Sequence, residues 1–256
     1  MMRSAESLSP YGREFFHQQQ RGSISSAEVT TPLLMSLVDI RSAVDVGCGV
    51  GTWLKVLMAH GVRDVLGIDG EYVDRGALQI PSYRFLPLDI RQPFTLSRRF
   101  DVALSLEVAE HLPADCAEGF IDSLARLAPV ILFSAAIPFQ GGTDHINEQW
   151  PEYWAELFRR RGYVPIDCIR SHIWDDPRVE WWYAQNTLVY ADEEGIKKNA
   201  ALAGCNRCTS PKRLSLVHPK KYLAAADPAP QSLGLRRCLS LTVVNAKYAV
   251  LKRFKR

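Results

Sequence analysis

Apolar and polar residues follow two periods along the chain, and the two periods alternate in a regular order. Short runs rich in β-branched and aliphatic residues predict strands, and stretches with an apolar residue every third or fourth position predict helices. The predicted strands are residues 42–47, 64–69, 83–89, 99–107 and 129–136, and the predicted helices are residues 25–39, 51–61, 114–128 and 151–162. Ser25 and Glu28, which have the spacing of a capping box, mark the expected start of the first helix. Strands separated by helices predict an α/β fold with a mainly parallel sheet and helices on both faces.

Two β-rich runs, at residues 163–174 and 179–191, end this pattern. No helix is predicted between them, so the two runs can pair only as an antiparallel hairpin. The sequence therefore predicts one antiparallel strand in an otherwise parallel sheet.

Charge divides the 256 residues into an acidic body and a basic tail. Residues 1–194 carry 17 Lys+Arg and 27 Asp+Glu, a net charge of −10, whereas residues 195–256 carry 14 Lys+Arg and one acid, a net charge of +13. The tail is rich in Gly, Pro and Ala, and a helical stripe returns only in its last residues, 239–256. We predict an N-terminal extension at 1–24, a main domain at 25–194 and a basic C-terminal extension at 195–256.

The composition favours a globular cytoplasmic protein. No apolar run reaches the roughly 18 residues that span a bilayer, and the first residues lack the apolar core of a signal peptide. The six cysteines have no framework spacing, which favours reduced thiols. The basic terminal helix can contact the anionic inner face of a membrane, and packing against the body is the alternative.

The tail also holds the pair Cys205 and Cys208, with His218 and Cys238 further along. This spacing fits no zinc-binding pattern well. The acidic pair at 175–176 is explained by turn chemistry, so no metal site is predicted.

The segment VDVGCGVGTWL carries the clearest chemistry. Gly47, Gly49 and Gly51 stand where a strand must turn sharply into a helix, and the missing Cβ permits positive φ and close approach of a ligand. The helix N-terminus beyond them suits an anionic group. Thr52 occupies the last glycine position of the dinucleotide fingerprint, so a nucleotide-like cofactor other than NAD is predicted.

Acidic residues stand at the ends of the neighbouring strands. Asp69 can accept both ribose hydroxyls, and Asp89 can accept from an exocyclic amine. Asp45 would repel a pyrophosphate but can hold an ammonium, directly or through water. Any one of these acids alone is explained more simply as a turn residue. The occurrence of all three at successive strand ends favours an adenosine-containing cofactor.

The ordered segments VDVGCGVGTWL, VLGIDG, FLPLDI and FDVALSLEVAEHL closely resemble the class I S-adenosylmethionine-dependent methyltransferases over roughly residues 25–190. The resemblance implies a Rossmann-like, seven-stranded sheet in the order 3-2-1-4-5-7-6, with S-adenosyl-L-methionine as cofactor. It also implies a place for each site residue: Gly47, Gly49 and Gly51 around the methionine part, Asp69 on the ribose, Asp89 near the adenine and Glu107 by the methionine end. It does not assign a base.

The polar segment GGTDHINEQW, residues 141–150, follows the most apolar run of the chain. Sites in open α/β sheets lie at the carboxyl ends of the strands, so we expect this segment to line the active site. Transfer to a hydroxyl requires alignment and removal of a proton, which a neutral imidazole can accept. His145 is therefore the predicted general base and His111 the second candidate. The alternative is a hydrogen-bonded loop histidine beside Asn147 as a helix N-cap.

Residues that follow this segment favour a sugar as acceptor. Five of the six tryptophans fall between residues 150 and 182, near amides such as Gln185 and Asn186, although core packing explains any single tryptophan more simply. The residues predicted to bind the acceptor are Asn147, Glu148, Trp150 and Trp182. The segment also resembles a bacterial subgroup that accompanies surface-glycan pathways.

We predict O-methylation of a sugar-containing or other small polar acceptor, in surface-glycan or secondary metabolism. One alternative is an RNA methyltransferase whose basic tail contacts phosphates, but the fourth strand ends in SLEVAEHL instead of a base-holding motif. Nucleic acid is therefore not the favoured partner. The other alternative is a non-catalytic partner subunit, against which the intact glycine and aspartate set argues. The oligomeric state is not predicted.

Overall fold

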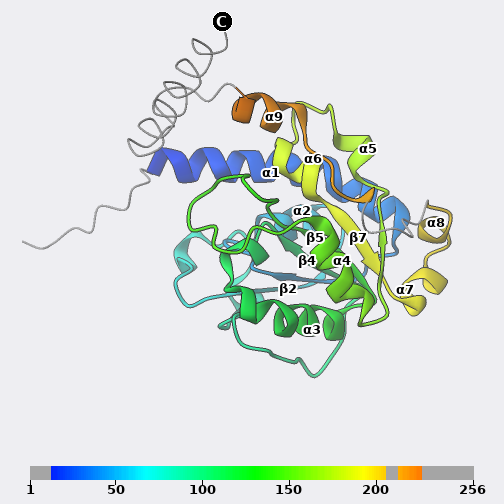
Figure 1. Ribbon diagram of the computed structural model, residues 1–256. Coiled ribbons are helices and arrows are strands. Elements are labelled where there is room, and N and C mark those ends of the chain that lie inside the picture. The colour runs from blue at the N-terminus through cyan, green and yellow to red at the C-terminus, as the bar shows by residue number, and fades with distance from the viewer. Residues whose placement is uncertain (1–12, 206–212, 227–256) are drawn as a thin grey trace, which may run out of the picture. The chain divides into compact units, whose positions relative to one another are not determined.

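The computed structural model describes residues 13–205 and 213–226. The described residues form one sheet with helices on both faces (Figure 1). Within these residues the strands are β1 (Ser42–Val46), β2 (Asp64–Asp69), β3 (Phe85–Pro87), β4 (Val102–Leu106), β5 (Val130–Ser134), β6 (Val164–Ile166) and β7 (Leu188–Ala191). The α-helices are α1 (Arg13–Leu37), α2 (Thr52–Ala59), α3 (Ala117–Leu127), α4 (Pro151–Arg159), α5 (Arg170–Ile173), α6 (Trp181–Asn186), α7 (Glu193–Lys198), α8 (Ala200–Ala203) and α9 (Pro219–Ala226). Short 3-10 helices are η1 (Arg75–Ala77), η2 (Ser82–Arg84), η3 (Ala109–His111) and η4 (Ala114–Cys116).

The strand order is β3-β2-β1-β4-β5-β7-β6. Strands β1 to β5 pair in parallel with their neighbours, and β7 pairs antiparallel with both β5 and β6. The expected order and the single antiparallel strand are confirmed. Because β1, β2, β4 and β5 are parallel, their carboxyl ends meet at one edge of the sheet, and both the glycine turn and the segment after β5 begin at this edge.

Alternate residues of the central strands face two apolar clusters, one on each side of the sheet. In β5, Val130 and Leu132 pack with residues of α1 and α2, while Ile131 and Phe133 pack with residues of α3 and α4. Figure 1 shows α1 and α2 on the side of the sheet opposite α3. Parallel strands that are buried on both faces need apolar residues at successive positions, which explains the run VILFS.

The segment between β6 and β7 differs from the predicted hairpin of two long strands. The two strands pair antiparallel, as predicted. Both are shorter than predicted, however, and α5 and α6 lie between them, so the prediction of no helix between the two runs is wrong. The Arg170 side chain, which is 1% exposed, explains the difference. Its guanidinium donates to the Asp167 carboxylate and to the main-chain carbonyls of Gln185 and Leu214. These contacts join residues far apart in the chain, and local propensity does not encode them.

Helix α1 begins before the predicted capping box, which is therefore wrong. Ser25 and Glu28 lie inside the helix. The Ser25 hydroxyl donates to the main-chain carbonyls of Gly22, at 3.2 Å, and Arg178, at 2.7 Å. A serine that bonds back to the preceding turn lets a helix continue through it. The domain boundaries at 24/25 and 194/195 stay predictions, and α1 and α7 run across them.

The chain divides into two compact units between Leu216 and Val217, and α9 belongs to the second. In the described ranges, no helix has both the length and the apolar character that a bilayer crossing requires. Cys208 and Cys238, considered above for zinc, and the predicted membrane-contacting helix at 239–256 lie outside the described residues.

Candidate active site

Strand β1 turns into α2 through the three predicted glycines. Gly47, Gly49 and Gly51 have φ values of 82°, 53° and 85°, which L-residues rarely adopt. A Cβ on Gly47 would lie 2.4 Å from the Val108 side chain, whereas a Cβ on Gly49 would meet no atom within 4 Å. Gly47 thus allows the turn to approach the loop after β4, and Gly49 leaves the main chain open to a ligand.

Asp69 ends β2 and holds this glycine turn. Its buried carboxylate accepts hydrogen bonds from the main-chain N–H groups of Gly49 and Gly70, both at 2.7 Å, and from the Tyr72 hydroxyl. Tyr72 is 83% exposed, so its ring can move away and give its place on Asp69 to a ribose hydroxyl. Tyr72 belongs to no predicted motif, and its position three residues after Asp69 is the one signal of its role in the sequence.

Asp45 is buried beside the glycine turn. Burial, with a smaller contribution from the charge of Asp69, raises the pKa of Asp45 to about 8. The side chain is therefore mostly neutral at pH 7, and a nearby cation would favour its charged form. The predicted role of Asp45 toward an ammonium group therefore requires that the bound ammonium itself shift the side chain to its charged form.

Asp89 lies two residues beyond β3 in an exposed position. Its two carboxylate oxygens accept from the Arg91 guanidinium, both at 2.8 Å, and hydrogen bonding to Arg91 lowers the pKa of Asp89. An adenine amine would have to share this carboxylate with Arg91, and the adenine contact stays a prediction.

Glu107, directly after β4, anchors a buried polar network. Its carboxylate accepts from Nε2 of Gln140 at 3.0 Å and from Nδ2 of Asn186 at 3.1 Å. Nε2 of Gln185 donates to Oε1 of Gln140 at 3.1 Å. Burial raises the pKa of Glu107. Gln185 and Asn186, grouped above with the sugar-binding candidates, are therefore engaged in holding Glu107, and Gln140 was not identified from the sequence.

Two histidines and a glutamate meet beyond β4 and β5. Glu110 and His111 lie in η3, His145 lies in the segment after β5, and one nitrogen or oxygen atom of each lies within 4.8 Å of the others. The two imidazoles form a T-shaped pair with centroids 4.8 Å apart and an interplanar angle of 87°. His111 is exposed as a whole, and the partial desolvation of its ring, followed by the charge of His145, lowers its pKa, which favours a neutral ring. The structure thus brings the two predicted base candidates together.

Glu110 is the most deeply buried member of this cluster. It is 0% exposed, and neither of its carboxylate oxygens has a hydrogen-bond partner in the described part of the chain. Burial, followed by the charge of Glu107, raises the pKa of Glu110 well above its usual range. The Glu110 main-chain carbonyl accepts from the N–H groups of Ile146, at 2.9 Å, and Asn147, at 3.0 Å. These bonds fix the segment 141–150 against η3.

Glu148 positions His145 within that segment. Its carboxylate accepts from the N–H groups of Phe139, at 2.7 Å, and Gly141, at 2.9 Å, and lies 3.0 Å from Nδ1 of His145. Phe139 and Asp144 have φ values of 66° and 57°. Left-handed non-glycine residues of this kind concentrate at functional sites. The predicted contact of Glu148 with an acceptor stays a prediction.

The other predicted acceptor-binding residues have different surroundings. Asn147 is 3% exposed, and its Oδ1 accepts from Nε2 of Gln149 at 3.0 Å. Trp150 precedes α4 at the N-cap position, so the alternative of Asn147 as that cap is wrong. Trp182 lies in α6, half-buried against the cluster that contains α1 and α2. Trp150, at 42% exposure, is the most open of the predicted set.

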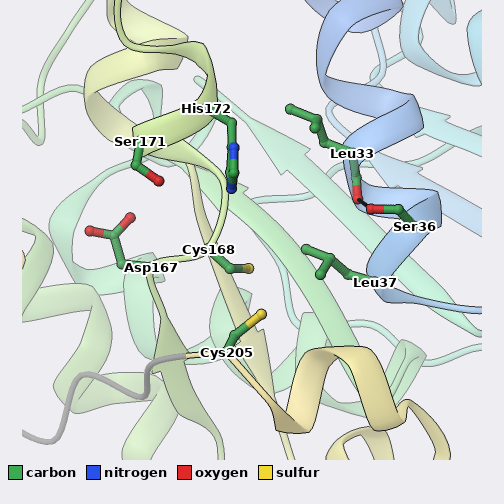
Figure 2. A pocket seen from close by; sticks show the side chains of 8 residues that line it. All are labelled: Leu33, Ser36, Leu37, Asp167, Cys168, Ser171, His172 and Cys205. Carbon is green, nitrogen blue, oxygen red and sulfur yellow. Dashed lines mark hydrogen bonds between the residues drawn. The ribbon is translucent and has the colours of Figure 1, made fainter.

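A cavity of about 320 Å³ lies elsewhere, between α1 and the segment after β6. Figure 2 shows Leu33 and Leu37 of α1 facing Cys168, Cys205 and His172 across it. None of the predicted cofactor-binding, catalytic or acceptor-binding residues lines this cavity, so it is not the candidate active site.

A family model described as a methyltransferase domain matches residues 15–186, well over half of the chain. The chain belongs to the methyltransferase domain family. The matched residues include the glycine turn, Asp69, Glu107 and both histidines. No curated protein matches this methyltransferase.

Several solved structures are similar to this chain, and two of them, with TM-scores of 0.50 or more, share its fold. The sugar N-methyltransferase KedS8 from Streptoalloteichus is 16% identical, with a TM-score of 0.53, over 75% of this chain and 99% of that one. The magnesium protoporphyrin IX methyltransferase from Synechocystis, with bound SAH (S-adenosylhomocysteine), is 18% identical, with a TM-score of 0.50, over 72% and 90%. DesVI from Streptomyces venezuelae is 22% identical, with a TM-score of 0.41, and the match spans 58% of its length.

The residues at the carboxyl edge of the sheet fit the cofactor of this family. A Cβ at Gly47 would clash with the Val108 side chain, so the glycine turn tolerates no side chain at this position. Asp69 presents a buried carboxylate, and Asp45 can become charged beside an ammonium. The protein is an S-adenosylmethionine-dependent methyltransferase, as predicted.

Proposed function

We propose that this methyltransferase transfers the methyl group to a hydroxyl oxygen of a sugar-containing or other small polar acceptor, in surface-glycan or secondary metabolism. The histidine pair His111–His145 carries the proposal, because it lies on the loops after β4 and β5. A hydroxyl must lose its proton as its oxygen is methylated, and an imidazole can accept that proton. KedS8 acts on a sugar, which is consistent with the proposed class of acceptor.

Each residue of the edge then has a proposed task. The glycine turn lets the main chain approach the cofactor, Asp69 accepts from its ribose, Asp45 faces its ammonium, Glu107 lies by its methionine end and Asp89 lies near its adenine. When bound, the cofactor supplies an electrophilic methyl group on sulfur.

On the acceptor side, His145 is the first candidate for removing the hydroxyl proton and His111 the second. The 3.0 Å contact between Nδ1 of His145 and Glu148 favours the tautomer that leaves Nε2 unprotonated. We propose that the acceptor contacts four residues: Trp150, Trp182, Asn147 and Glu148.

Product analysis tests this proposal. The enzyme is incubated with methyl-labelled S-adenosylmethionine and a panel of glycans, small phenols, amines and RNA, and the labelled product is located by mass spectrometry and NMR. We expect an O-methyl ether on a sugar or another small hydroxyl compound. Label on nitrogen or in RNA would contradict the proposal, and S-adenosylmethionine binding without transfer to any acceptor would favour a non-catalytic subunit.

A further inference from the structure

We propose that Glu110, His111 and His145 bind a divalent transition-metal cation, which activates the acceptor hydroxyl. This inference rests on the proposed function and refines its activation step. One ligand atom from each residue lies within 4.8 Å of the others. Two imidazoles with one carboxylate suit Mn²⁺, Fe²⁺, Co²⁺ or Zn²⁺ better than Mg²⁺ or Ca²⁺, which prefer oxygen ligands.

The environment of Glu110 is the first observation in favour of a cation. A buried carboxylate without hydrogen-bond donors costs far more free energy than one that is hydrogen-bonded. Glu107, the neighbouring carboxylate, receives side-chain amide donors from Gln140 and Asn186, whereas no side-chain amide reaches Glu110 among the residues that the structure describes. The nearby main-chain N–H groups of Glu110 and Ala136 only partly offset the effects of burial and of the Glu107 charge, which raise the pKa of Glu110. A dication would give Glu110 its missing partner and balance the charge of the two carboxylates.

The surroundings of His145 are the second observation. Metal-binding histidines commonly donate their other ring N–H to a carboxylate, which fixes the tautomer and the ring orientation. Nδ1 of His145 has such a partner in Glu148, which two main-chain N–H groups hold in turn. Nε2 is then the nitrogen available to a cation. A Cβ on Gly142 would lie 2.3 Å from Nε2, so only glycine lets the main chain at this position come so close to the imidazole without a clash.

The distances suit one shared ion. In a tetrahedral site with bonds of about 2.1 Å, the ligand atoms lie about 3.4 Å apart. The present limit of 4.8 Å therefore requires each pair to close by at most about 1.4 Å, which side-chain rotations can provide. Three protein ligands leave coordination positions open for an acceptor oxygen.

A hydroxyl at such a position has a lowered pKa. Its proton leaves to solvent, the oxygen lone pair forms the new C–O bond, and the electron pair of the breaking C–S bond stays on sulfur, which becomes a neutral thioether. The cation thus replaces direct proton removal by His145, and His145 acts as a ligand.

Manganese binding tests the site independently of turnover. The tag-free full chain is freed of metal with a chelator and titrated with Mn²⁺, with binding followed by calorimetry and by electron paramagnetic resonance of free Mn²⁺. We expect one ion per chain and a loss of affinity on the order of 100-fold or more in Glu110→Gln, His111→Ala and His145→Ala, because each variant removes one ligand of the ion. His172→Ala, an exposed histidine on α5, should bind like the wild type.

A glycine pair keeps the test informative if a ligand variant fails to fold. Gly142→Ala would place a methyl group 2.3 Å from Nε2 of His145, whereas a Cβ on Gly141 would meet no atom within 4 Å. Both residues have positive φ, 156° and 73°, so both alanine variants are strained. We expect Mn²⁺ affinity to fall at least about ten-fold in Gly142→Ala and to stay near the wild-type value in Gly141→Ala.

The outcomes separate the inference from the function on which it rests. Absence of Mn²⁺, Co²⁺ and Zn²⁺ binding, or equal binding by all ligand variants, would overturn the metal site. Full methyl transfer by the chelated enzyme would overturn activation by a cation and leave the proposed function standing. Metal binding that depends on the three ligands, with no labelled hydroxyl product, would support the site and contradict the proposed function.

Discussion

Replacing His145 by alanine should lower the rate of methyl transfer by roughly 100-fold to 10,000-fold at saturating cofactor, with cofactor affinity unchanged. The reason is that the imidazole lies in the acceptor-side cluster, 4.8 Å from His111 between ring centroids, and not in the glycine turn. Loss of either a proton acceptor or a metal ligand removes activation of the hydroxyl. Single-turnover kinetics measure the rate, and calorimetry measures cofactor affinity.

The exposed residue His172 provides the matched control, since His172→Ala removes an imidazole outside the cluster. If His145 only braces its segment through Glu148, the alanine variant should lose thermal stability or acceptor affinity, with little change in the saturated rate. Near-normal turnover with saturating acceptor would end the proposal for His145 and leave the role to His111.

Replacing Gly47 by alanine should lower cofactor affinity on the order of 100-fold, because a small misplacement of binding groups has large effects. The new methyl group would lie 2.4 Å from the Val108 side chain and at a φ of 82°. Overpacking and left-handed strain together predict a loss of about 2–4 kcal/mol in the free energy of unfolding. Calorimetry with S-adenosylmethionine and denaturant unfolding measure the two effects.

Gly61→Ala is the control for Gly47→Ala. Gly61 has a φ of 96°, and its Cβ would meet no atom within 4 Å, so the substitution introduces strain without a clash. We expect a loss of about 1–2 kcal/mol in stability and unchanged cofactor affinity. Equal cofactor affinity in both variants would show that the close approach of the glycine turn to Val108 is not needed for binding.

The parts of the fold that the sequence predicts are those with strong local signals. The strands around the glycine turn have apolar runs bounded by turn residues, and β2 begins and ends at the predicted residues 64 and 69. The antiparallel pairing of β6 and β7 is confirmed. The helices between them were not predicted, because Arg170, buried in the fold, ties α5 to residues 15 and 44 positions away. No pattern in a short window carries that information.

The residues of the candidate site likewise fall into those with a local sequence signal and those without one. The glycines, Asp69 and Glu107 are recognisable because each stands at a strand end with a characteristic spacing. Glu110 has no such signal in the sequence, since only the folded chain shows that its carboxylate is buried beside two histidines. The amides that hold Glu107 come from Gln140 and Asn186, which lie 33 and 79 residues from it along the chain.

The structure of the enzyme with bound S-adenosylhomocysteine tests the central claim most directly. We expect the ribose hydroxyls on Asp69, with the Tyr72 hydroxyl displaced from that carboxylate, and the sulfur facing the His111–His145 pair with room for one acceptor group between them. A complex in which Tyr72 stays on Asp69, or in which the sulfur points away from both histidines, would contradict the proposed active site.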